Sequence, residues 1–599
     1  MMKIGLEIHF QLKGVKLFCS CSTEGEKSNY LFKRKMTPTM SEMGHIDRAA
    51  RYENIRNRDF NYYTSTNSCL VDADEEPPHM PDDSNINTAI IVSMALHCKI
   101  VDYVSFMRKI VIDGSNTSGF QRTGIVGLNG YVETSQGRVR ISTVTLEEDA
   151  SRKISESGKN AFYSLDRLGI PLIEISTEPD IKDENHAIET ARKIGFIVMS
   201  TGKFRGEVDS IRQDVNFSMG YGRVEIKGVS KLSLIKDTIK YEIQRQKSLA
   251  DISGIIKARG GTEITDFMDI THILKDTDSK IIKAGLNKNK KVFCAKINNA
   301  RGLLKNGNYR LGRELADVAK NMGIGGMMHS DELPGYGLTD NDVNNINNFM
   351  GIENNDAIIM VITDPEIITA FKSELDERLK NLMSMNLAET RAATEDGETR
   401  FLRPLSGGER MYPETDIGLI EIPLKRLNSL EGLVPESMED ALNNLKNNYG
   451  FSQTEAMGII NNNLYGDFKD YIKVLNEPKI ISRIILQKLP EYEKKYNKKL
   501  SGDELMEIFT MANENKWGRD SVEKALELYV SGKYPLKILA NAEELKPLDA
   551  GRLREIIIEL MRTQEITEKN LIYLLKNKTK SSFDARDAIK IFENIKNNS

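Results

Sequence analysis

The sequence predicts an α+β protein of several domains, and three observations support this class. Alternating apolar and polar residues predict strands at 3–12 and 211–218. Helical and strand patterns then intermix without the regular repeat of a doubly wound fold. From residue 423 onward the pattern is almost entirely helical. A chain of 599 residues also exceeds what one hydrophobic core supports, so we expect several domains.

The expected domain boundaries follow changes in sequence texture. Residues 1–265 are rich in predicted strands and polar motifs, and residues 386–425 show the same combination. The intervening segment, 266–385, has strands and helices of its own, so we expect one domain interrupted by an inserted α+β domain. The helical remainder is divided into a domain at 426–519 and a tail domain at 520–599. Within the insert, the patterns predict strands at 291–298 and 357–363 and helices at 313–321 and 367–382.

Composition is typical of a globular protein and excludes several classes. Hydrophobic residues make up 40% of the chain, charged residues make up 28%, and the formal net charge is -4. This charge provides no global attraction to nucleic acid, so any RNA contact must be local. No apolar run approaches the roughly 20 residues that span a bilayer, and Glu7 and His9 interrupt any signal-peptide core. Five cysteines in so long a chain predict a reducing, cytoplasmic environment.

The strand predicted at 3–12 places Glu7 and His9 on one face, two residues apart, and apolar residues on the other. A carboxylate and an imidazole directed at one point suit a hard metal ion or a proton transfer. On spacing alone, the solvated face of an edge strand is the favoured explanation.

Acidic residues occur in two further strand contexts. Glu147, Glu148 and Asp149 follow a predicted strand, and clustered carboxylates repel one another unless they are solvated or share a cation such as Mg²⁺. A solvated helix N-terminus is an equal alternative, and alternation does not say which acid points inward. Glu174 is a lone acid within the apolar strand 171–175. Burying a carboxylate there without a cation is costly, so a functional role is favoured.

A basic pair and a polar loop form a candidate phosphate-binding segment. Arg108 and Lys109 precede the loop 113–119, which contains Ser115 and Asn116. Small polar loops offer backbone amides and hydroxyls to a phosphate or to transferred ammonia. The loop lacks the Lys-Ser/Thr ending of a Walker loop, and a plain turn explains it equally well.

Cys19 and Cys21 have the spacing of half a zinc site. His45 is the only candidate nearby, and no second Cys or His pair follows at the usual distance. Packed thiols are therefore the favoured interpretation.

Several segments together resemble the B/E family of glutamyl-tRNA(Gln) amidotransferase subunits. The motifs occur in the family's order over nearly the whole chain, at 4–12 (IGLEIHFQL), 17–19 (LFC), 146–150 (LEEDA), 171–175 (PLIEI) and 391–416. The run at 107–122 and the insert, with LGREL at 311–315 and HSDEL at 329–333, are most similar to the archaeal E-type branch. The insert itself resembles a domain of bacterial-type aspartyl-tRNA synthetases.

The resemblance implies a catalytic cradle related to glutamine synthetase, then a helical domain and a helical tRNA-binding tail. It implies ATP and Mg²⁺, with Glu7, His9, Glu148 and Glu174 as metal ligands. The expected catalytic residues are Glu148, Glu174 and Lys109, and the expected phosphate or substrate contacts are Arg108, Ser115, Asn116, Arg212 and Lys227. Basic residues of the tail expected to contact tRNA are Lys576, Lys578, Lys580, Arg586 and Lys590, although a solvated helix face is the alternative.

Some bacterial members of the family follow their Cys-x-Cys with a Cys-x-x-Cys. Residues 36–44 contain no cysteine, which leaves a structural zinc ion in doubt here.

The implied activity is phosphorylation of the γ-carboxylate of glutamate misacylated on tRNA(Gln), followed by amidation with ammonia. The chain has no Ser-x-Ser-Gly amidase signature, so the expected ammonia source is a partner protein. The resemblance implies that this partner is the asparaginase-like, D-type glutaminase, in a heterodimer or a dimer of heterodimers. An aspartyl-tRNA synthetase relative and a non-catalytic tRNA-binding scaffold are the alternatives. The first would release pyrophosphate rather than ADP.

Overall fold

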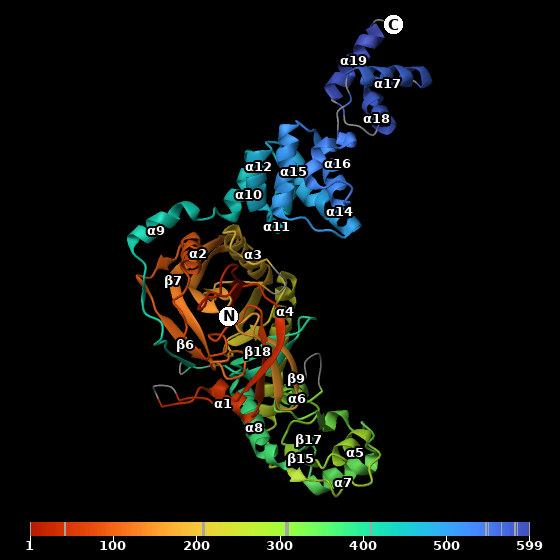
Figure 1. The fold of residues 1–599 in the computed structure, drawn as a ribbon. Helices are drawn as coiled ribbons and strands as arrows, with labels where there is room; N and C mark the ends of the chain where they lie inside the picture. The colour runs from red at the N-terminus through yellow and green to blue at the C-terminus, as the bar shows by residue number, and fades with distance from the viewer. Residues whose placement is uncertain are drawn as a thin grey trace. The chain divides into compact units, whose positions relative to one another are not determined.

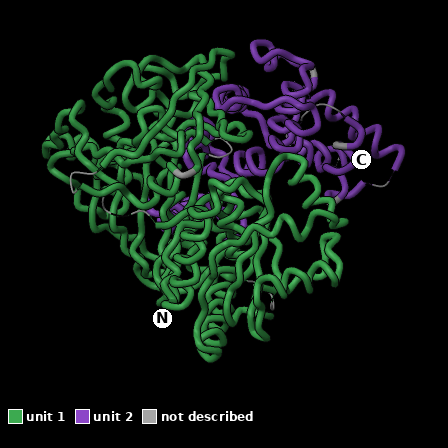
Figure 2. The backbone as a smooth tube through the Cα atoms, turned by 90° about the horizontal axis from the view of Figure 1, so that it is seen from below, with its two compact units in different colours: residues 1–435 green, residues 436–599 purple. Residues whose placement is uncertain are grey.

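The computed structural model describes residues 2–40, 44–206, 210–305, 311–405, 407, 410–545, 548, 550–564, 566–579, 583 and 585–597. The chain forms two compact units, Met1–Pro435 and Glu436–Ser599 (Figure 2). The first unit combines sheets with helices, and the described residues of the second unit form helices and turns (Figure 1). The predicted α+β class is confirmed.

The centre of the first unit is an 11-stranded sheet with the order β19-β18-β13-β12-β1-β11-β8-β7-β6-β20, to which β4 adds through β7. Neighbouring strands are antiparallel except β13 and β18. The strands are β1 (Lys3–Gln11), β4 (Lys99–Ile100), β6 (Phe106–Ile110), β7 (Phe120–Thr134), β8 (Gly137–Glu148), β11 (Pro171–Thr177), β12 (Ile211–Ser218), β13 (Val224–Lys227), β18 (Glu389–Ala393), β19 (Thr399–Pro404) and β20 (Met411–Pro413). Both strands predicted at 3–12 and 211–218 are confirmed.

Strand alternation gives this sheet one apolar and one polar face. Ile4, Leu6 and Ile8 are buried in a core that includes α2 (Asp83–Ala95) and α3 (Glu184–Ser200), which cover the apolar face (Figure 1). Asp82 and Asp183 accept hydrogen bonds from first-turn amides and so fix where these helices begin. The side chains between the apolar residues of β1 therefore point to the opposite, polar face.

A second sheet of the first unit has the order β2-β3-β10-β9. Its strands are β2 (Lys27–Arg34), β3 (Asp59–Ser65), β9 (Arg152–Ser157) and β10 (Asn160–Ser164). One of its faces packs through Tyr62 and Tyr163, whose hydroxyls donate 2.7 Å hydrogen bonds to the carbonyls of Gly114 and Asp113. The small sheet thereby holds the loop 113–119. The remaining elements of the first unit outside residues 266–385 include helix α1 (Arg48–Ile55) and helix α9 (Leu424–Leu430). Strands β5 (Tyr103–Val104) and β21 (Ile420–Glu421) pair with each other in a two-stranded sheet.

Residues 266–385 form a third sheet, of order β14-β15-β17-β16, with four α-helices in the described part of this segment. The elements are β14 (Met268–Asp269), α5 (Lys280–Leu286), β15 (Lys291–Ile297), α6 (Leu311–Asn321), β16 (Met327–His329), α7 (Asp340–Met350), β17 (Ala357–Thr363) and α8 (Ile368–Ser384). One core of this segment lies between the sheet, α5 and α7, and the other extends to Leu249 and Ile252 of α4 (Leu232–Ala258). The strands and helices predicted here are confirmed, while the domain boundaries themselves stay a prediction.

The second unit consists of short helices with apolar cores. The helices are α10 (Met438–Asn447), α11 (Gln453–Asn461), α12 (Tyr465–Val474), α13 (Pro478–Arg483), α14 (Leu489–Tyr496), α15 (Gly502–Glu514), α16 (Arg519–Val530), α17 (Ala550–Thr563), α18 (Glu568–Lys578) and α19 (Ala585–Asn597). The last three share a core that includes Leu553, Leu571 and Phe592. Within the described ranges, none of the helices of either unit has the length and apolarity to cross a bilayer.

Candidate active site on the polar face of the large sheet

Three donor side chains from adjacent strands converge on the polar face, and we call His9, Glu147 and Glu174 the first cluster. The register of β1 against β11 places His9 opposite Glu174, and His9 Nε2 lies 2.9 Å from Glu174 Oε2. Thr145 of β8 is opposite Glu174, and Glu147 follows on the same face two residues later. The ligand atoms of the three residues lie within 4.8 Å of one another.

Charges around the first cluster keep the Glu174 carboxylate ionised. Lys109 Nζ lies 3.3 Å from Glu147 Oε1. Burial raises the pKa of Glu174, but the charge of Lys109 and the hydrogen bond with His9 outweigh burial and hold this pKa well below its usual range. Burial lowers the pKa of His9, yet Glu174 more than compensates and raises it. The Thr145 hydroxyl has no hydrogen-bond partner among the described residues, so one buried oxygen remains available beside the cluster.

A second cluster, Glu7, Asp214 and Glu225, lies beside the first. Glu7 is two residues before His9 and stands opposite Asp214 of β12, and the ligand atoms of the three carboxylates again lie within 4.8 Å of one another. Burial and the charge of Glu174 raise the pKa of Glu7. Lys227 binds Asp214 at 2.8 Å and also pairs with Glu225. Burial raises the pKa of Glu225, but Lys227 outweighs burial and lowers it to about 2.

Arg212 borders the first cluster on the β12 side. It stands opposite His9 in the pairing of β1 with β12 and forms an ion pair with the buried Asp149. Asp149 also accepts a 2.6 Å hydrogen bond from the Gln11 side chain. These contacts fix the Arg212 guanidinium near the edge of the polar face.

The composition of the two clusters fits a divalent cation. Five carboxylates and one imidazole supply the hard oxygen and nitrogen donors that Mg²⁺ accepts, and the Thr145 hydroxyl is a further oxygen, without a partner among the described residues. Lys109, Arg212 and Lys227 place positive charge around the same donors, as a site for a polyphosphate requires. The arrangement suits phosphoryl transfer, in which positioning and charge neutralisation provide most of the catalysis.

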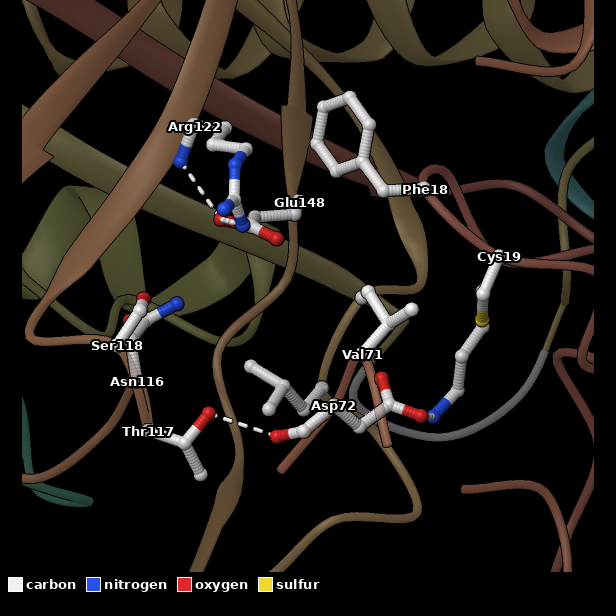
Figure 3. Close-up of a pocket in the computed structure, with 12 residues that line it drawn as sticks. Phe18, Cys19, Val71, Asp72, Asn116, Thr117, Ser118, Arg122 and Glu148 are labelled. Atoms are coloured by element: carbon white, nitrogen blue, oxygen red, sulfur yellow. Dashed lines mark hydrogen bonds and ion pairs between the residues drawn. The ribbon is translucent and has the colours of Figure 1, made fainter. Parts of the chain in front are cut away.

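The structure does not bring Glu148 together with His9 and Glu174. Glu148 Oε1 accepts a 2.8 Å hydrogen bond from the Arg122 backbone amide and lines a small pocket with Phe18 and Asp72 (Figure 3). Burial raises the pKa of this carboxyl above its ordinary value. Successive residues of a strand point to opposite faces, so Glu147 occupies the position beside His9 that the resemblance gave to Glu148.

Arg108 and the loop 113–119 also lie on the Glu148 side. Arg108 donates hydrogen bonds of 2.9 and 2.6 Å to Glu414 and one of 3.0 Å to Asp416, and so faces away from Lys109. Asn116 lines the Glu148 pocket, and its buried Nδ2 has no hydrogen-bond partner within the described part of the chain (Figure 3). The Ser115 carbonyl accepts hydrogen bonds from the amide and hydroxyl of Ser151. Arg108, Ser115 and Asn116 therefore stand apart from the first cluster.

The basic residues predicted for the tail lie on its last two helices where they are described. Lys578 pairs with Glu559 of α17 at 2.7 Å, and Arg586 and Lys590 lie on α19. Lys580 and the side chain of Lys576 lie outside the described residues.

A group of thiols lies away from both clusters. Cys19 and Cys21 meet Cys69 and Asp72, which follow β3, and their ligand atoms lie within 4.8 Å of one another. Thiolate sulfur and carboxylate oxygen are both zinc donors, and four such ligands match the number that a tetrahedral zinc site requires. Lys16 Nζ also lies 3.2 Å from Asp72 Oδ2. Spacing alone missed the second half of this group because Cys69 reaches it from a distant loop.

We expect purified protein to contain about one zinc ion per chain, bound by this group. Cys69→Ser should lose that zinc, because one of three thiolate ligands is removed. Cys98→Ser is the matched control, since Cys98 lies outside the group. Metal analysis of the three proteins is the measurement, and wild-type protein with no more zinc than Cys69→Ser would contradict the expectation.

Sequence reasoning missed Asp214 and Glu225 and left Glu147 unresolved. Asp214 alternates with the apolar residues of 211–218, so its face was predictable, but its neighbour Glu7 was not. Which strands are adjacent is set by pairings between residues far apart in the chain, and local patterns do not contain that information.

Comparison with known proteins is consistent with these features. The family model described as the GatB/GatE catalytic domain matches residues 2–428. The E-type glutamyl-tRNA(Gln) amidotransferase subunit of Thermoplasma volcanium is 48% identical over 592 residues, which cover 98% of each chain. The protein of the same name from Thermoplasma acidophilum is 45% identical over 599 residues, 99% of each chain. The Sulfurisphaera tokodaii protein is 39% identical over 619 residues, 99% of this chain and 98% of its own. The predicted resemblance is confirmed, and the chain belongs to the family of E-type glutamyl-tRNA(Gln) amidotransferase subunits.

Proposed function

We propose that the chain is the kinase and transferase subunit of a tRNA-dependent amidotransferase. Its substrates would be ATP, ammonia and glutamate misacylated on tRNA(Gln), and its product would be Gln-tRNA(Gln). The observation that carries the proposal is the pairing of two partly buried carboxylate clusters with Lys109, Arg212 and Lys227 on one face of the sheet. Phosphoryl transfer from ATP requires carboxylates that hold a cation and basic side chains that contact the phosphates, and this face has both kinds of residue.

The chemistry needs activation because a carboxylate cannot expel an oxide ion. A γ-carboxylate oxygen attacks the terminal phosphorus of ATP, ADP leaves, and an acyl phosphate forms. Ammonia then attacks the carbonyl carbon of this acyl phosphate (Cδ of the glutamate), inorganic phosphate leaves, and the new amide nitrogen releases one proton. Lys109 and Lys227 would contact the phosphoryl oxygens and balance their charge as it moves, since both ammonium groups already neutralise buried carboxylates.

His9, Glu147 and Glu174 would hold Mg²⁺, together with the carboxylates of the second cluster. When bound, the ion supplies charge neutralisation and alignment of the phosphates. The Lys109 charge holds Glu174 ionised, so this ligand needs no deprotonation before metal binds. Arg212, fixed by Asp149, would orient the substrate carboxylate or a phosphate at the edge of the face.

Ammonia would come from a second protein, the asparaginase-like, D-type glutaminase, in a heterodimer or a dimer of heterodimers in the cytoplasm. Ammonium is not a nucleophile, so a protected path between the two active sites has a chemical purpose. The basic side chains of the last helices, among them Lys578, Arg586 and Lys590, would contact the phosphates of the tRNA.

The test is incubation of the purified chain with Glu-tRNA(Gln), ATP, Mg²⁺ and free ammonium, without the partner. We expect Gln-tRNA(Gln) to form with one ADP per amide. Glutamine in place of ammonium should give product only after the glutaminase partner is added. Release of pyrophosphate would identify an aspartyl-tRNA synthetase relative, and no product with ammonium would identify a tRNA-binding scaffold. Either result would overturn the proposal.

A further inference from the structure

The small sheet β2-β3-β10-β9 has an outward face that carries an aromatic pair. Tyr62 and Tyr163 are buried in the core beneath this sheet, so their neighbours Tyr63 and Phe162 point to the other side. The rings of Tyr63 and Phe162 are stacked, with centroids 6.3 Å apart and planes 29° apart. Both side chains are half-buried. The core beneath the sheet does not account for this pair, and both rings are partly exposed on the other side.

Positive charge surrounds the aromatic pair. Lys27 Nζ lies 3.7 Å from the centre of the Tyr63 ring. Two more lysines lie at the other end of β3, where the strand begins at Asp59. Lys159 is next to Asn160, which pairs with Asp59, and Lys35 directly follows β2. Lys27, Lys35 and Lys159 are all exposed, and no carboxylate pairs with them within the described ranges. Cations therefore lie at both ends of the aromatic surface.

The acids of the four strands do not cancel this charge. They are Asp59 and Glu156, since the sequences of β2 and β10 contain no acid. Asp59 pairs with Lys33 at 3.0 Å. Glu156 pairs with Arg56 and Arg58, each at 3.1 Å. Both acids of the four described strands are consequently paired with basic side chains.

Stacked aromatic rings on a sheet, bordered by unpaired lysines, are the features that bind unpaired nucleotides. Bases stack on the rings whatever their identity, and the lysines contact the phosphates between them. The centre of a protein interface is instead depleted in lysine. A paired stem offers its phosphates and groove edges, not free base faces, so the aromatic surface selects single-stranded RNA.

We propose that this face, formed by Tyr63 and Phe162 with Lys27, Lys35 and Lys159, binds unpaired nucleotides of the tRNA substrate. The inference rests on the proposed function for the identity of that RNA. It assigns tRNA recognition to the first unit, in addition to the contacts expected of the helical tail. We call this surface the stacking face.

The aromatic residues are tested by the affinity of the full chain for tRNA(Gln) and for a single-stranded oligonucleotide with the sequence of its 3′ end. Phe162→Ala and Tyr63→Ala should each weaken both complexes about tenfold or more, because each removes a ring on which a base stacks. Tyr63→Phe should keep both affinities within about twofold, since the ring remains. Tyr103→Ala is the matched control, because Tyr103 is a 54% exposed tyrosine on β5, outside the stacking face.

The lysines are tested by the salt dependence of tRNA binding. Lys27→Ala, Lys35→Ala and Lys159→Ala should each reduce the slope of log affinity against log salt by about 1. These exposed substitutions should leave the thermal unfolding midpoint unchanged, which keeps the test valid if an aromatic variant folds poorly. Lys240→Ala is the control, since Lys240 is an exposed lysine of α4.

The outcomes separate this inference from the proposed function. With ammonium and saturating tRNA, the stacking-face variants should turn over within about twofold of wild type while their KM for tRNA rises by the same factor as Kd. Wild-type affinity for RNA in both Tyr63→Ala and Phe162→Ala would overturn the inference. It would also be overturned if these variants bound RNA normally but no longer bound the glutaminase partner, because the face would then be a protein interface. If the wild-type chain bound both RNAs through this face but formed no amide, only the proposed activity would be contradicted, and the inference about RNA binding would stand.

Discussion

Glu174→Gln is expected to abolish ATP-dependent amidation, with a fall in kcat of at least about a thousandfold. The substitution keeps the shape of the side chain but removes a buried negative charge that faces His9 at 2.9 Å and the Lys109 ammonium. The cation then loses a ligand, and Lys109 loses a charge that holds it in place. Affinity for tRNA should stay within about threefold, because Glu174 is not among the residues that we propose contact tRNA. Rates with ammonium and tRNA binding by the same protein provide the measurement.

A comparison of Glu147→Gln with Glu148→Gln decides which neighbour serves the metal. Glu147 lies in the first cluster, so its variant should need a higher Mg²⁺ concentration for half-maximal activity and be partly rescued by added Mg²⁺. Glu148 accepts a hydrogen bond from Arg122 on the other side of the strand, so its variant should show the Mg²⁺ dependence of wild type. The reverse pattern would contradict the assignment of Glu147, and wild-type activity in Glu174→Gln would contradict the whole site.

Local pattern was sufficient to predict half of this site. The alternation of 3–12 placed Glu7 and His9 on one face of a strand, and a lone acid in an apolar strand singled out Glu174. Both inferences use only the two-residue period of a strand and the cost of burying a charge. The fold class followed from the same periodicities.

The remainder depends on register, which the local pattern does not contain. The choice between Glu147 and Glu148 is a shift of one residue, and a shift of one residue exchanges the two faces of a strand. The β11–β8 pairing shifts register between Thr143 and Ile141 of β8, so alternation counted from the hairpin does not carry through to the end of β8. Cys69 and Asp72 reach Cys19 for the same reason: a tertiary contact joins segments that local spacing treats as unrelated.

The sequence pattern did not single out a group of charged residues in the middle of the chain, because charge in a sequence normally indicates a surface. Two arginines and three glutamates are instead buried, and a third arginine is 12% exposed, where α4, residues 266–385 and β18 meet. They are Arg245, Arg378, Arg391, Glu242, Glu314 and Glu389. Excision of residues 266–385 would remove Glu314 and Arg378 and uncover Leu249 and Ile252, so we expect that the rest of the first unit would be destabilised by their removal.

Arg245→Met is expected to destabilise the first unit by about 3–5 kcal/mol, the usual result of removing one partner from a buried ion pair. The Arg245 guanidinium binds Glu242 at 2.7 Å, Glu314 at 3.0 Å and Glu389 at 2.5 Å, and its side chain is fully buried. Methionine fills similar volume but leaves three carboxylates with two arginines. The thermal midpoint of the first unit should fall by roughly 3–6 °C, because the same free energy shifts the midpoint of a large unit less than that of a small domain.

Acid should weaken the wild-type protein through the same cluster. Burial raises the pKa of Glu389, but Arg245, Arg378 and Arg391 outweigh burial and lower it to about 2, from an ordinary value of 4.5. Because the folded-state pKa is depressed, the ionised carboxylate stabilises the fold above pH 4.5, and this contribution is lost as the pH falls from there toward 2. Arg245→Met should show a smaller loss of stability over that range, since one of the charges that depress the pKa is absent.

The control for Arg245→Met is Arg140→Met, which breaks an arginine–aspartate pair of similar geometry on the surface. Arg140 donates two 2.8 Å hydrogen bonds to Asp180, but its side chain is 63% exposed, so water replaces the lost partner. Its unfolding midpoint should therefore match that of wild type. Thermal unfolding of full-length variants, followed at several pH values between about 3 and 7, measures both effects. Equal midpoints for the two variants at neutral pH would show that the buried cluster contributes no more than an exposed pair. In that case relaxation of the fold or penetration of water would compensate for the lost charge of Arg245. Residues 266–385 would then be held against α4 mainly by apolar contacts.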